Sequence, residues 1–152
     1  VDKDGKRINE KPLNEVLNHA ELEKGKCPYI VGFRNIFQDK EKLYMVLEMC
    51  RDGELGMYVS SEFTKHVGPN QKVTEEFRKK IAPHRKGVAL SEEEGKHYFR
   101  QLISAVAYMH SKQIAHRDIS LENVLLRDER KNLRLCDFGL SVKLPHSRSR
   151  LR

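Results

Sequence analysis

Two short segments near the C-terminal end of the sequence concentrate side chains that can handle protons and metal ions. Residues 116–123 read His-Arg-Asp-Ile-Ser-Leu-Glu-Asn, and residues 136–139 read Cys-Asp-Phe-Gly. Transfer of a γ-phosphoryl group needs a carboxylate that orients and deprotonates the attacking hydroxyl, and oxygen ligands that hold Mg²⁺ against the phosphates. Asp118 can supply the first, and Asn123 with Asp137 can supply the second, because Mg²⁺ keeps several waters and needs few protein ligands.

The residues between the two segments predict that the segments meet in space. Residues 124–126 and 133–136 are short apolar stretches that flank the polar turn 127–132, which is the pattern of a β-hairpin. A hairpin returns the chain to its starting point. Asp137 is therefore expected beside the loop that carries Asp118.

These motifs resemble the catalytic loop and the Asp-Phe-Gly element of the eukaryotic protein kinase family. An Asp-Phe-Gly tripeptide alone would be weak evidence. Here it accompanies His-Arg-Asp, an asparagine five residues after that aspartate and an intervening strand pair, which together are specific. The resemblance implies that Asp118 is the catalytic base, that Asn123 and Asp137 are metal ligands, and that ATP and Mg²⁺ are used.

The N-terminal part of the sequence predicts a helix and a hairpin. Pro12 is followed by apolar residues at helical spacing and then by Gly25, so a helix is expected between them. Residues 29–37 and 43–49 are rich in β-branched and aromatic residues and flank the polar turn 38–42, which predicts a β-hairpin.

A second, longer helix is predicted directly before the catalytic segment. Residues 91–94 read Ser-Glu-Glu-Glu, a capping-box sequence, and apolar residues recur at helical spacing behind it, so residues 91–111 are expected to form an amphipathic helix. Residues 60–90 contain two glycines and two prolines without a sustained period. We interpret them as an insertion or long loop, with a short helix near residues 74–81.

Composition places the chain among soluble globular domains. Its 152 residues can form one hydrophobic core, and 38% of them are hydrophobic and 34% charged. No apolar run approaches bilayer length, so no membrane partner is expected. The three cysteines lack Cys-x-x-Cys spacing, which favours neither a disulfide framework nor a zinc site and predicts an intracellular, cytoplasmic location.

The net charge of +7 raises nucleic acid as a partner, but its distribution argues against one. Residues 61–90 and 143–152 each carry a net charge of +4, and the rest of the chain is close to neutral. These basic stretches have few aromatic residues, so they do not form a platform for stacking bases. We interpret them as solvated surface and rank nucleic-acid binding last; the oligomeric state is left open.

The order of these elements resembles the middle of a kinase domain. The resemblance implies an α+β, protein kinase-like two-lobe fold that is incomplete: part of the N-lobe sheet with helix C, the hinge, helices D and E, the catalytic loop and strands seven and eight. Residues 1–152 would be a partial kinase domain. Residues 1–50 would form the N-lobe part and hinge, and residues 51–152 the C-lobe part with an insertion around 60–90.

The resemblance also assigns residues to the nucleotide site. Leu47 would be the gatekeeper, and the backbone groups of Glu48 and Cys50 would bind the adenine edge, which leaves their side chains free to vary. Glu54 falls where an acid that contacts ribose or substrate often lies. Leu125 would form the floor beneath adenine, and otherwise it is simply a buried strand leucine.

Further residues are assigned to supporting roles by the same resemblance. Glu15 would pair with the strand-three lysine of the family, or else be a solvated helical glutamate, and in that register His19 would face inward. Arg117 would hold a phosphate on the activation segment, for which Ser147 and Ser149 are candidate acceptors.

Two residues beside the catalytic carboxylates have structural interpretations. His116 is expected to pack against Phe138 rather than to act as an acid or base. Cys136 would line the back of the nucleotide pocket, where we favour a small hydrophobic side chain over a reactive thiol.

The sequence also departs from the family. Ser120 replaces the lysine that serine/threonine kinases usually place two residues after the base, although residues 121–123 favour serine/threonine specificity. The glycine-rich loop, the strand-three lysine and the Ala-Pro-Glu motif do not occur in the 152 residues, so we expect a slice of a longer domain with little activity by itself. The function implied is transfer of phosphoryl from Mg-ATP to Ser/Thr hydroxyls of a protein substrate; the alternative is a pseudokinase that binds nucleotide or acts as a scaffold.

Overall fold

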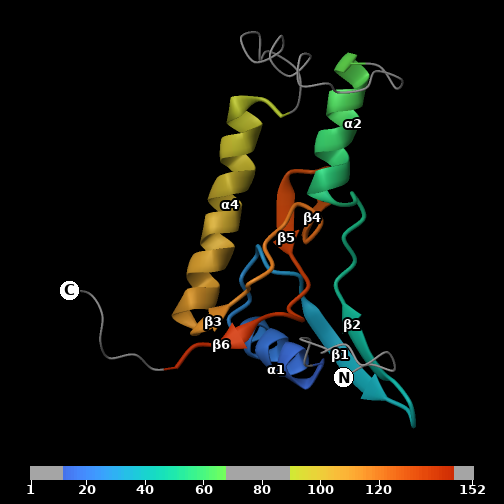
Figure 1. The fold of residues 1–152 in the computed structure, drawn as a ribbon, viewed down its shortest axis with the longest axis vertical. Helices are drawn as coiled ribbons and strands as arrows, with labels where there is room; N and C mark the ends of the chain where they lie inside the picture. Colours follow the sequence, from blue (N-terminus) through green and yellow to red (C-terminus); the bar gives the residue numbers. More distant parts are fainter. Residues whose placement is uncertain (1–11, 68–89, 146–152) are drawn as a thin grey trace, which may run out of the picture.

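The computed structural model describes residues 12–67 and 90–145, and Figure 1 shows how their helices and strands are arranged. In chain order the elements are α1 (Pro12–Glu23), β1 (Phe33–Gln38), β2 (Leu43–Leu47), α2 (Leu55–Val67), α4 (Glu92–Ser111), β3 (Ile114–Ala115), β4 (Val124–Arg127), β5 (Asn132–Leu135) and β6 (Val142–Lys143).

Helix α1 forms where the sequence predicts it. It begins at Pro12, whose fixed φ suits a first helical turn, and it ends at Glu23 before a turn. Its C-terminal half is buried through three residues: Asn18, His19 and Leu22.

The C-terminal end of α1 is held by helix α4. Tyr108 of α4 donates a hydrogen bond from its hydroxyl to the carbonyl of Leu22 at 2.7 Å. Just beyond α1, a Cβ added to Gly25 would lie 2.1 Å from the Tyr108 hydroxyl oxygen, so only glycine lets the chain pass this close. The two helix ends are therefore tied together.

Strands β1 and β2 form the predicted antiparallel hairpin, with a register shift between Phe33 and Asn35. The first strand begins at Phe33 rather than at residue 29, because the preceding residues pair elsewhere. Ile30 makes a parallel bridge to Leu135 of β5, and the Val31 amide donates to the Leu135 carbonyl at 3.0 Å. This short pairing connects the first hairpin to the second.

The predicted insertion at residues 60–90 begins too early, because helix α2 continues to Val67. Leu55 is buried and Tyr58 and Val59 pack against the core, which is the i, i+3, i+4 spacing of an amphipathic helix. The short helix expected at residues 74–81 lies outside the described residues.

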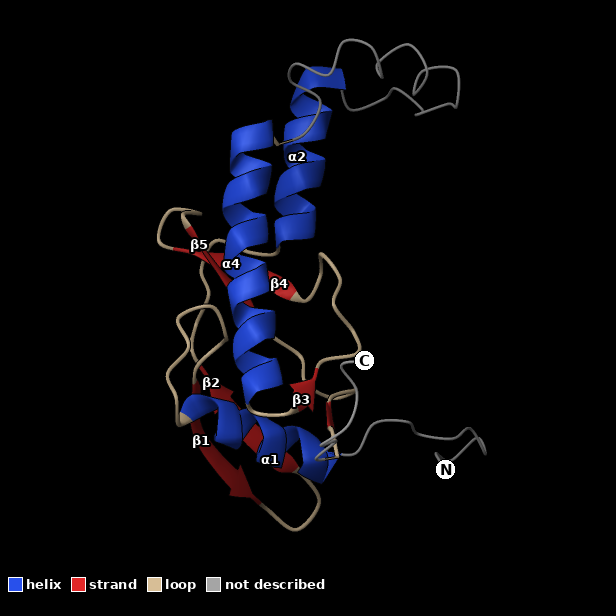
Figure 2. Cartoon of the chain, turned by 90° about the vertical axis from the view of Figure 1, so that its left-hand side faces the viewer, coloured by secondary structure: helices blue, strands red, loops and turns tan. Residues whose placement is uncertain are grey.

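Helix α4 has the predicted capping box. The Ser91 hydroxyl accepts the Glu94 amide hydrogen at 3.1 Å, and the Glu94 carboxylate accepts the Ser91 amide hydrogen at 2.9 Å. Helix α4 packs on β5 and α2 packs on β4, so the two helices flank the β4–β5 hairpin. Figure 2 shows α1 and the β1–β2 hairpin at the other end of α4.

The hydrophobic core lies where α4 meets the β4–β5 hairpin. Burial alternates along both strands, as expected for a hairpin with one face on the core. The fully buried side chains of this region are Val124, Leu126, Leu133, Leu135, Met109 and Phe138. Within residues 12–67 and 90–145, no helix has both the length and the apolar character needed to cross a membrane.

Candidate active site

The loop between β3 and β4 brings Asn123 onto Asp118. The Asn123 side-chain nitrogen donates to the Asp118 carbonyl at 2.9 Å and to the Asp118 carboxylate at 2.9 Å. Because the nitrogen makes both bonds, the amide oxygen of Asn123 points away from Asp118 and can accept another partner. Asn123 thus fixes the orientation of the Asp118 carboxylate and presents one oxygen beside it.

The β4–β5 hairpin returns the chain to this loop, as its sequence predicts. The Cys136 amide donates to the Asn123 carbonyl at 2.9 Å, and the His116 ring nitrogen Nε2 lies 3.0 Å from the Cys136 carbonyl. The residue directly before Asp137 is therefore bonded to both ends of the catalytic loop.

His116 holds this junction as a neutral ring. Its Nδ1 accepts the Asp118 amide hydrogen at 3.2 Å, so the proton is on Nε2, which donates to Cys136. Burial lowers the pKa of His116, which keeps the ring neutral although the Cys136 carbonyl favours the charged form. The ring also packs on Phe138 with centroids 5.1 Å apart, which confirms the predicted contact.

Two residues of the site have left-handed backbone conformations. Arg117 has φ of 71° and Asp137 has φ of 61°. Such conformations cost ~1–3 kcal/mol for a residue with a side chain and persist only where surrounding contacts hold them. Asp137 is held in part by its own carboxylate, which accepts the Gly139 amide hydrogen at 3.1 Å.

Phe138 connects the site to helix α1. Its ring is fully buried between His116 and His19, and the His19 and Phe138 centroids lie 4.7 Å apart. His19 faces inward as predicted, and its Nε2 donates to the Val31 carbonyl at 2.7 Å. Burial lowers the pKa of His19, so this ring is also neutral.

A second contact joins α1 to the segment after Phe138. The Asn18 amide donates to the Ser141 hydroxyl at 2.9 Å, and that hydroxyl donates to the Phe138 carbonyl at 2.6 Å. Both polar side chains are buried. This pair could not be predicted from the sequence, because the two residues are far apart in the chain and neither belongs to a motif.

The predicted nucleotide residues lie along one path from β2 to β4. Leu47 ends β2, and Glu54 makes an antiparallel bridge to Leu125 in β4. Between them, the Glu48 amide donates to the Gly32 carbonyl at 2.8 Å, so this amide is already paired within the protein. Cys50 is partly buried between these two anchored ends.

The prediction that the Glu48 side chain is free to vary is wrong. Its carboxylate is only 10% exposed and accepts hydrogen bonds from Arg127 and Arg134. Burial alone would raise the pKa of Glu48, but the two guanidinium groups outweigh it and leave the pKa lowered. Pairings across so many residues have no local signal in the sequence.

Cys136 has the environment of a partly buried, weakly reactive thiol. Burial, with the charge of Asp137 next in effect, raises the pKa of Cys136 to about 11. Its sulfur lies 3.4 Å from the Asn123 carbonyl. This agrees with the interpretation as a small hydrophobic side chain.

The remaining predicted residues are less closely tied to the site. Arg117 is exposed, and Glu15 is half-buried in the first turn of α1, one turn before His19. Ser147 and Ser149 lie outside the described residues.

The donor set suits Mg²⁺. No group of three or more His, Cys, Asp or Glu side chains that could hold a metal occurs in the part of the chain that the structure describes. The Asn123 amide oxygen and the Asp137 carboxylate offer two hard oxygen ligands, which fits an ion that keeps most of its waters and also binds phosphate oxygens.

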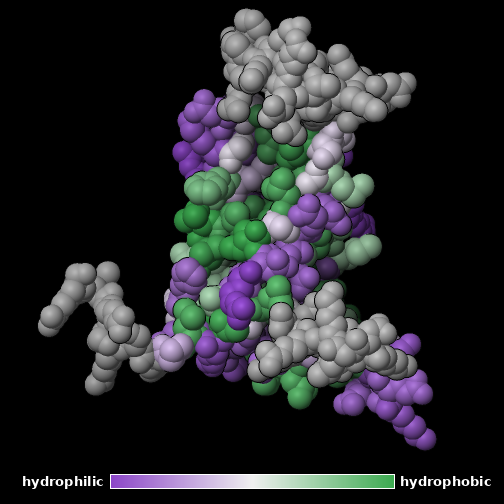
Figure 3. All heavy atoms as spheres, viewed as in Figure 1, coloured by the Kyte–Doolittle hydropathy of each residue, from purple (hydrophilic) through white to green (hydrophobic). Residues whose placement is uncertain are grey.

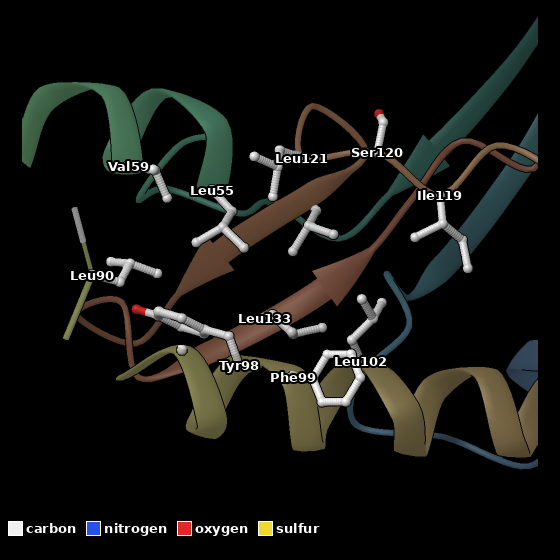
Figure 4. Close-up of a pocket in the computed structure, with 12 residues that line it drawn as sticks. Leu55, Val59, Leu90, Tyr98, Phe99, Leu102, Ile119, Ser120, Leu121 and Leu133 are labelled. Atoms are coloured by element: carbon white, nitrogen blue, oxygen red, sulfur yellow. The ribbon is translucent and has the colours of Figure 1, made fainter. Parts of the chain in front are cut away.

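An apolar cavity of about 350 Å³ lies behind the catalytic loop. Figure 4 shows Leu55 of α2 and Tyr98 of α4 reaching toward it, with Leu133 of β5 between them. Figure 3 shows apolar side chains gathered on this face along α4 and between α4 and α2, where Phe99 and Ile103 are half exposed or more. The lining carries no charged side chain, and it includes residues 119–121 of the loop that carries Asp118.

A mixed helix-and-strand fold that joins an Asp-Phe-Gly hairpin to an aspartate-bearing loop is compatible with the fold class of protein kinases. The protein kinase domain family matches residues 1–151, and the chain belongs to this family.

Individual relatives agree with this assignment. The chain is 33% identical over 131 residues to serine/threonine-protein kinase PLK4 of Xenopus laevis, an alignment that covers 86% of this chain and 11% of that protein. It is 36% identical over 138 residues to serine/threonine-protein kinase SRK2F of Arabidopsis thaliana, covering 90% and 31%. It is 40% identical over 115 residues to maternal embryonic leucine zipper kinase of Xenopus laevis, covering 76% and 14%. The chain spans less than a third of each of these relatives.

Proposed function

We propose that the protein transfers the γ-phosphoryl group of Mg-ATP to serine or threonine hydroxyls of protein substrates. The main support is the pair of hydrogen bonds that orients the Asp118 carboxylate through Asn123, with Asp137 joined to the same loop through Cys136. Family membership and the printed names of the serine/threonine kinase relatives support the reaction class.

Each site residue has a role in this proposal. Asp118 accepts the proton of the substrate hydroxyl, and its orientation by Asn123 directs that hydroxyl toward the phosphate. The Asn123 amide oxygen and the Asp137 carboxylate hold Mg²⁺, which when bound bridges phosphate oxygens and reduces their negative charge. Glu15 pairs with a lysine of the nucleotide site, and Arg117 binds a phosphate on the activation segment.

In this proposal the adenine base of ATP binds along the hinge that follows β2. The Glu48 carbonyl and the Cys50 backbone bind the adenine edge, Leu47 limits the depth of the pocket and Cys136 lines its back. Leu125 lies beneath the base, and Glu54 contacts ribose or substrate. The bridge between Glu54 and Leu125 supports this arrangement because it brings the end of the hinge onto β4.

The same proposal divides the chain into two parts. Residues 1–50 are the N-lobe part and hinge of a two-lobe kinase domain, and residues 51–152 are the C-lobe part. We place the protein in the cytoplasm, since its three cysteines are all unpaired.

A phosphotransfer assay on the protein with a panel of serine, threonine and tyrosine peptides tests the proposal. Asp118→Asn should lower kcat by about 10²–10⁴-fold, the usual contribution of a general base. Glu129→Gln is a control, because this glutamate is exposed in the β4–β5 turn. Unchanged activity of Asp118→Asn would contradict the assignment, and ATP binding without transfer in the wild type would favour the pseudokinase alternative.

A further inference from the structure

The Glu48 carboxylate joins the two β-hairpins of the structure. Its oxygen Oε2 faces the first hairpin, where it accepts the Gly32 amide hydrogen at 3.2 Å and lies 3.6 Å from Arg34. Its oxygen Oε1 faces the second hairpin, where it accepts hydrogen bonds from Arg127 and, at 2.9 Å, from Arg134. One buried anion thus contacts three cations from two sheets.

The arginines on the second hairpin are themselves fixed. Arg134 is only 11% exposed, and its guanidinium also donates to the Leu133 carbonyl at 2.9 Å. Arg127 also pairs with Asp128 at 3.0 Å. Because both arginines are held by other partners, they can act as fixed points for the Glu48 carboxylate.

The absence of a side chain at Gly32 leaves room for this contact. A Cβ at this position would lie 2.8 Å from Glu48 Oε2, well inside van der Waals contact. The backbone groups complete the contact, since the Glu48 amide donates to the Gly32 carbonyl while the Gly32 amide donates to the Glu48 side chain. A larger residue at position 32 would therefore push the Glu48 carboxylate away from the Gly32 amide.

The other end of the hinge is anchored on the same strands. The Asp52 amide donates to the Leu126 carbonyl at 3.2 Å, and the Leu126 amide donates to the Gly53 carbonyl at 2.8 Å. The Asp52 carboxylate accepts the Arg130 amide hydrogen at 3.0 Å. Residues 48–54 are consequently tied to the β4–β5 hairpin at both ends, with Cys50 between the ties.

We propose that Glu48 is a positioning residue: its carboxylate holds the hinge against β4 and β5, so that the backbone groups of Glu48 and Cys50 stay aligned with Leu125. Leu125 in β4 pairs directly with Arg134 in β5. Leu125, which would lie beneath the base, is therefore the cross-strand neighbour of Arg134, which binds the Glu48 carboxylate. The nucleotide part of this inference rests on the proposed function.

Glu48→Gln is the central variant, because it keeps the shape of the side chain and removes the charge that Arg134 and Arg127 bind. Arg127→Gln is a milder second variant, since Arg127 is 33% exposed and its loss leaves Arg134 paired. Glu41→Gln is the matched control, because Glu41 is exposed in the β1–β2 turn.

Two measurements are needed. The first is amide hydrogen exchange of residues 49–53 in the nucleotide-free protein. The second is the dependence of peptide phosphorylation on ATP concentration, which separates KM for ATP from kcat. Glu48→Gln should speed amide hydrogen exchange in the hinge and raise KM for ATP at least about tenfold, because hydrogen bonds between ionised groups are stronger than those of a neutral amide. Its kcat at saturating ATP should stay within about threefold of the wild type. Arg127→Gln should change both in the same direction but less.

The inference is overturned if the rate of amide exchange in the hinge is the same in Glu48→Gln as in Glu41→Gln. It is also overturned if kcat falls while KM for ATP stays unchanged, because that result indicates general damage to the fold. If Glu48→Gln does not fold, Arg127→Gln decides by the same criteria. A wild-type protein that neither binds ATP nor transfers phosphate refutes the proposed function instead, and hinge exchange alone then decides whether Glu48 holds the hinge.

Discussion

Replacing Asn123 with leucine tests whether its side chain restrains the Asp118 carboxylate, the proposed base. Leucine is close to asparagine in size but can donate no hydrogen bond. The substitution removes the bonds to the Asp118 carbonyl and carboxylate, each 2.9 Å long. Under the proposed function it also removes one metal ligand. The backbone carbonyl of residue 123, which accepts the Cys136 amide hydrogen, is retained.

The size of the effect follows from the two bonds. A neutral hydrogen bond contributes ~0.5–1.5 kcal/mol and one to a charged group ~1.5–3 kcal/mol, so the restraint is worth ~2–4.5 kcal/mol. At ~1.4 kcal/mol for each factor of ten, kcat/KM should fall between about 30-fold and 2,000-fold. Loss of the metal ligand can only enlarge this decrease.

The assay is steady-state phosphorylation of a peptide, with a second variant and a control. Asn123→Asp keeps an oxygen for the metal but places a like charge against Asp118, so its activity should also fall. Asn132→Leu is the matched control, because Asn132 makes the same kind of bond, 3.0 Å to the Asp128 carboxylate, in the turn outside the site.

Activity of Asn123→Leu within threefold of the wild type would refute this reasoning. Full activity of Asn123→Asp would show that the metal ligand matters and the restraint on Asp118 does not.

Three further predictions concern the fold and its titratable groups. Gln101→Leu should lower the free energy of unfolding in urea by ~1–3 kcal/mol, because the buried Leu133 amide loses its 2.8 Å acceptor, and a change below ~0.5 kcal/mol would contradict this. Burial lowers the pKa of His19 and of His116, so their stabilisation is complete above pH ~6.5 and is lost as the pH falls further. The urea midpoint should therefore be lower at pH 5.5 than at pH 7.5, with a smaller difference in His19→Leu; equal wild-type midpoints would argue against it. With its pKa raised to about 11, Cys136 should be labelled by iodoacetamide at pH 8 far more slowly than a free thiol, as intact mass would report, and rapid labelling would contradict the raised pKa.

Elements with a local signal were predictable from the sequence. Helix α1 begins at its proline, and α4 begins after the Ser91 capping box, because the residues that satisfy the helix termini are adjacent in the chain. The two hairpins were also predictable, since each has apolar stretches around a polar turn. The predicted insertion at residues 60–90 wrongly included the last turns of helix α2, which continues to Val67.

Features that depend on distant residues were not predictable. Strands β3 and β6 have two residues each and exist only because they pair with one another across the catalytic segment. The ion pairs of Glu48 and the bond between Asn18 and Ser141 likewise require the folded chain to bring their partners together. Motif spacing located the candidate catalytic residues, but it carried no information on the contacts that support them.

The hydrogen bond from Tyr108 to the Leu22 carbonyl holds the C-terminal end of helix α1 in place. Tyr108 and the buried ring of His19 hold the C-terminal end of this helix. Leu13 and Leu17, nearer its start, are 71% and 65% exposed. A rotation of α1 that keeps the Tyr108 hydrogen bond must pivot at Leu22. Glu15 lies about 10 Å from that pivot along the helix axis, at ~1.5 Å per residue. A tilt of about 20° would carry the Glu15 backbone by about 4 Å, roughly the reach of the ion pair proposed for Glu15, and it would also displace the buried contacts of Asn18 and His19.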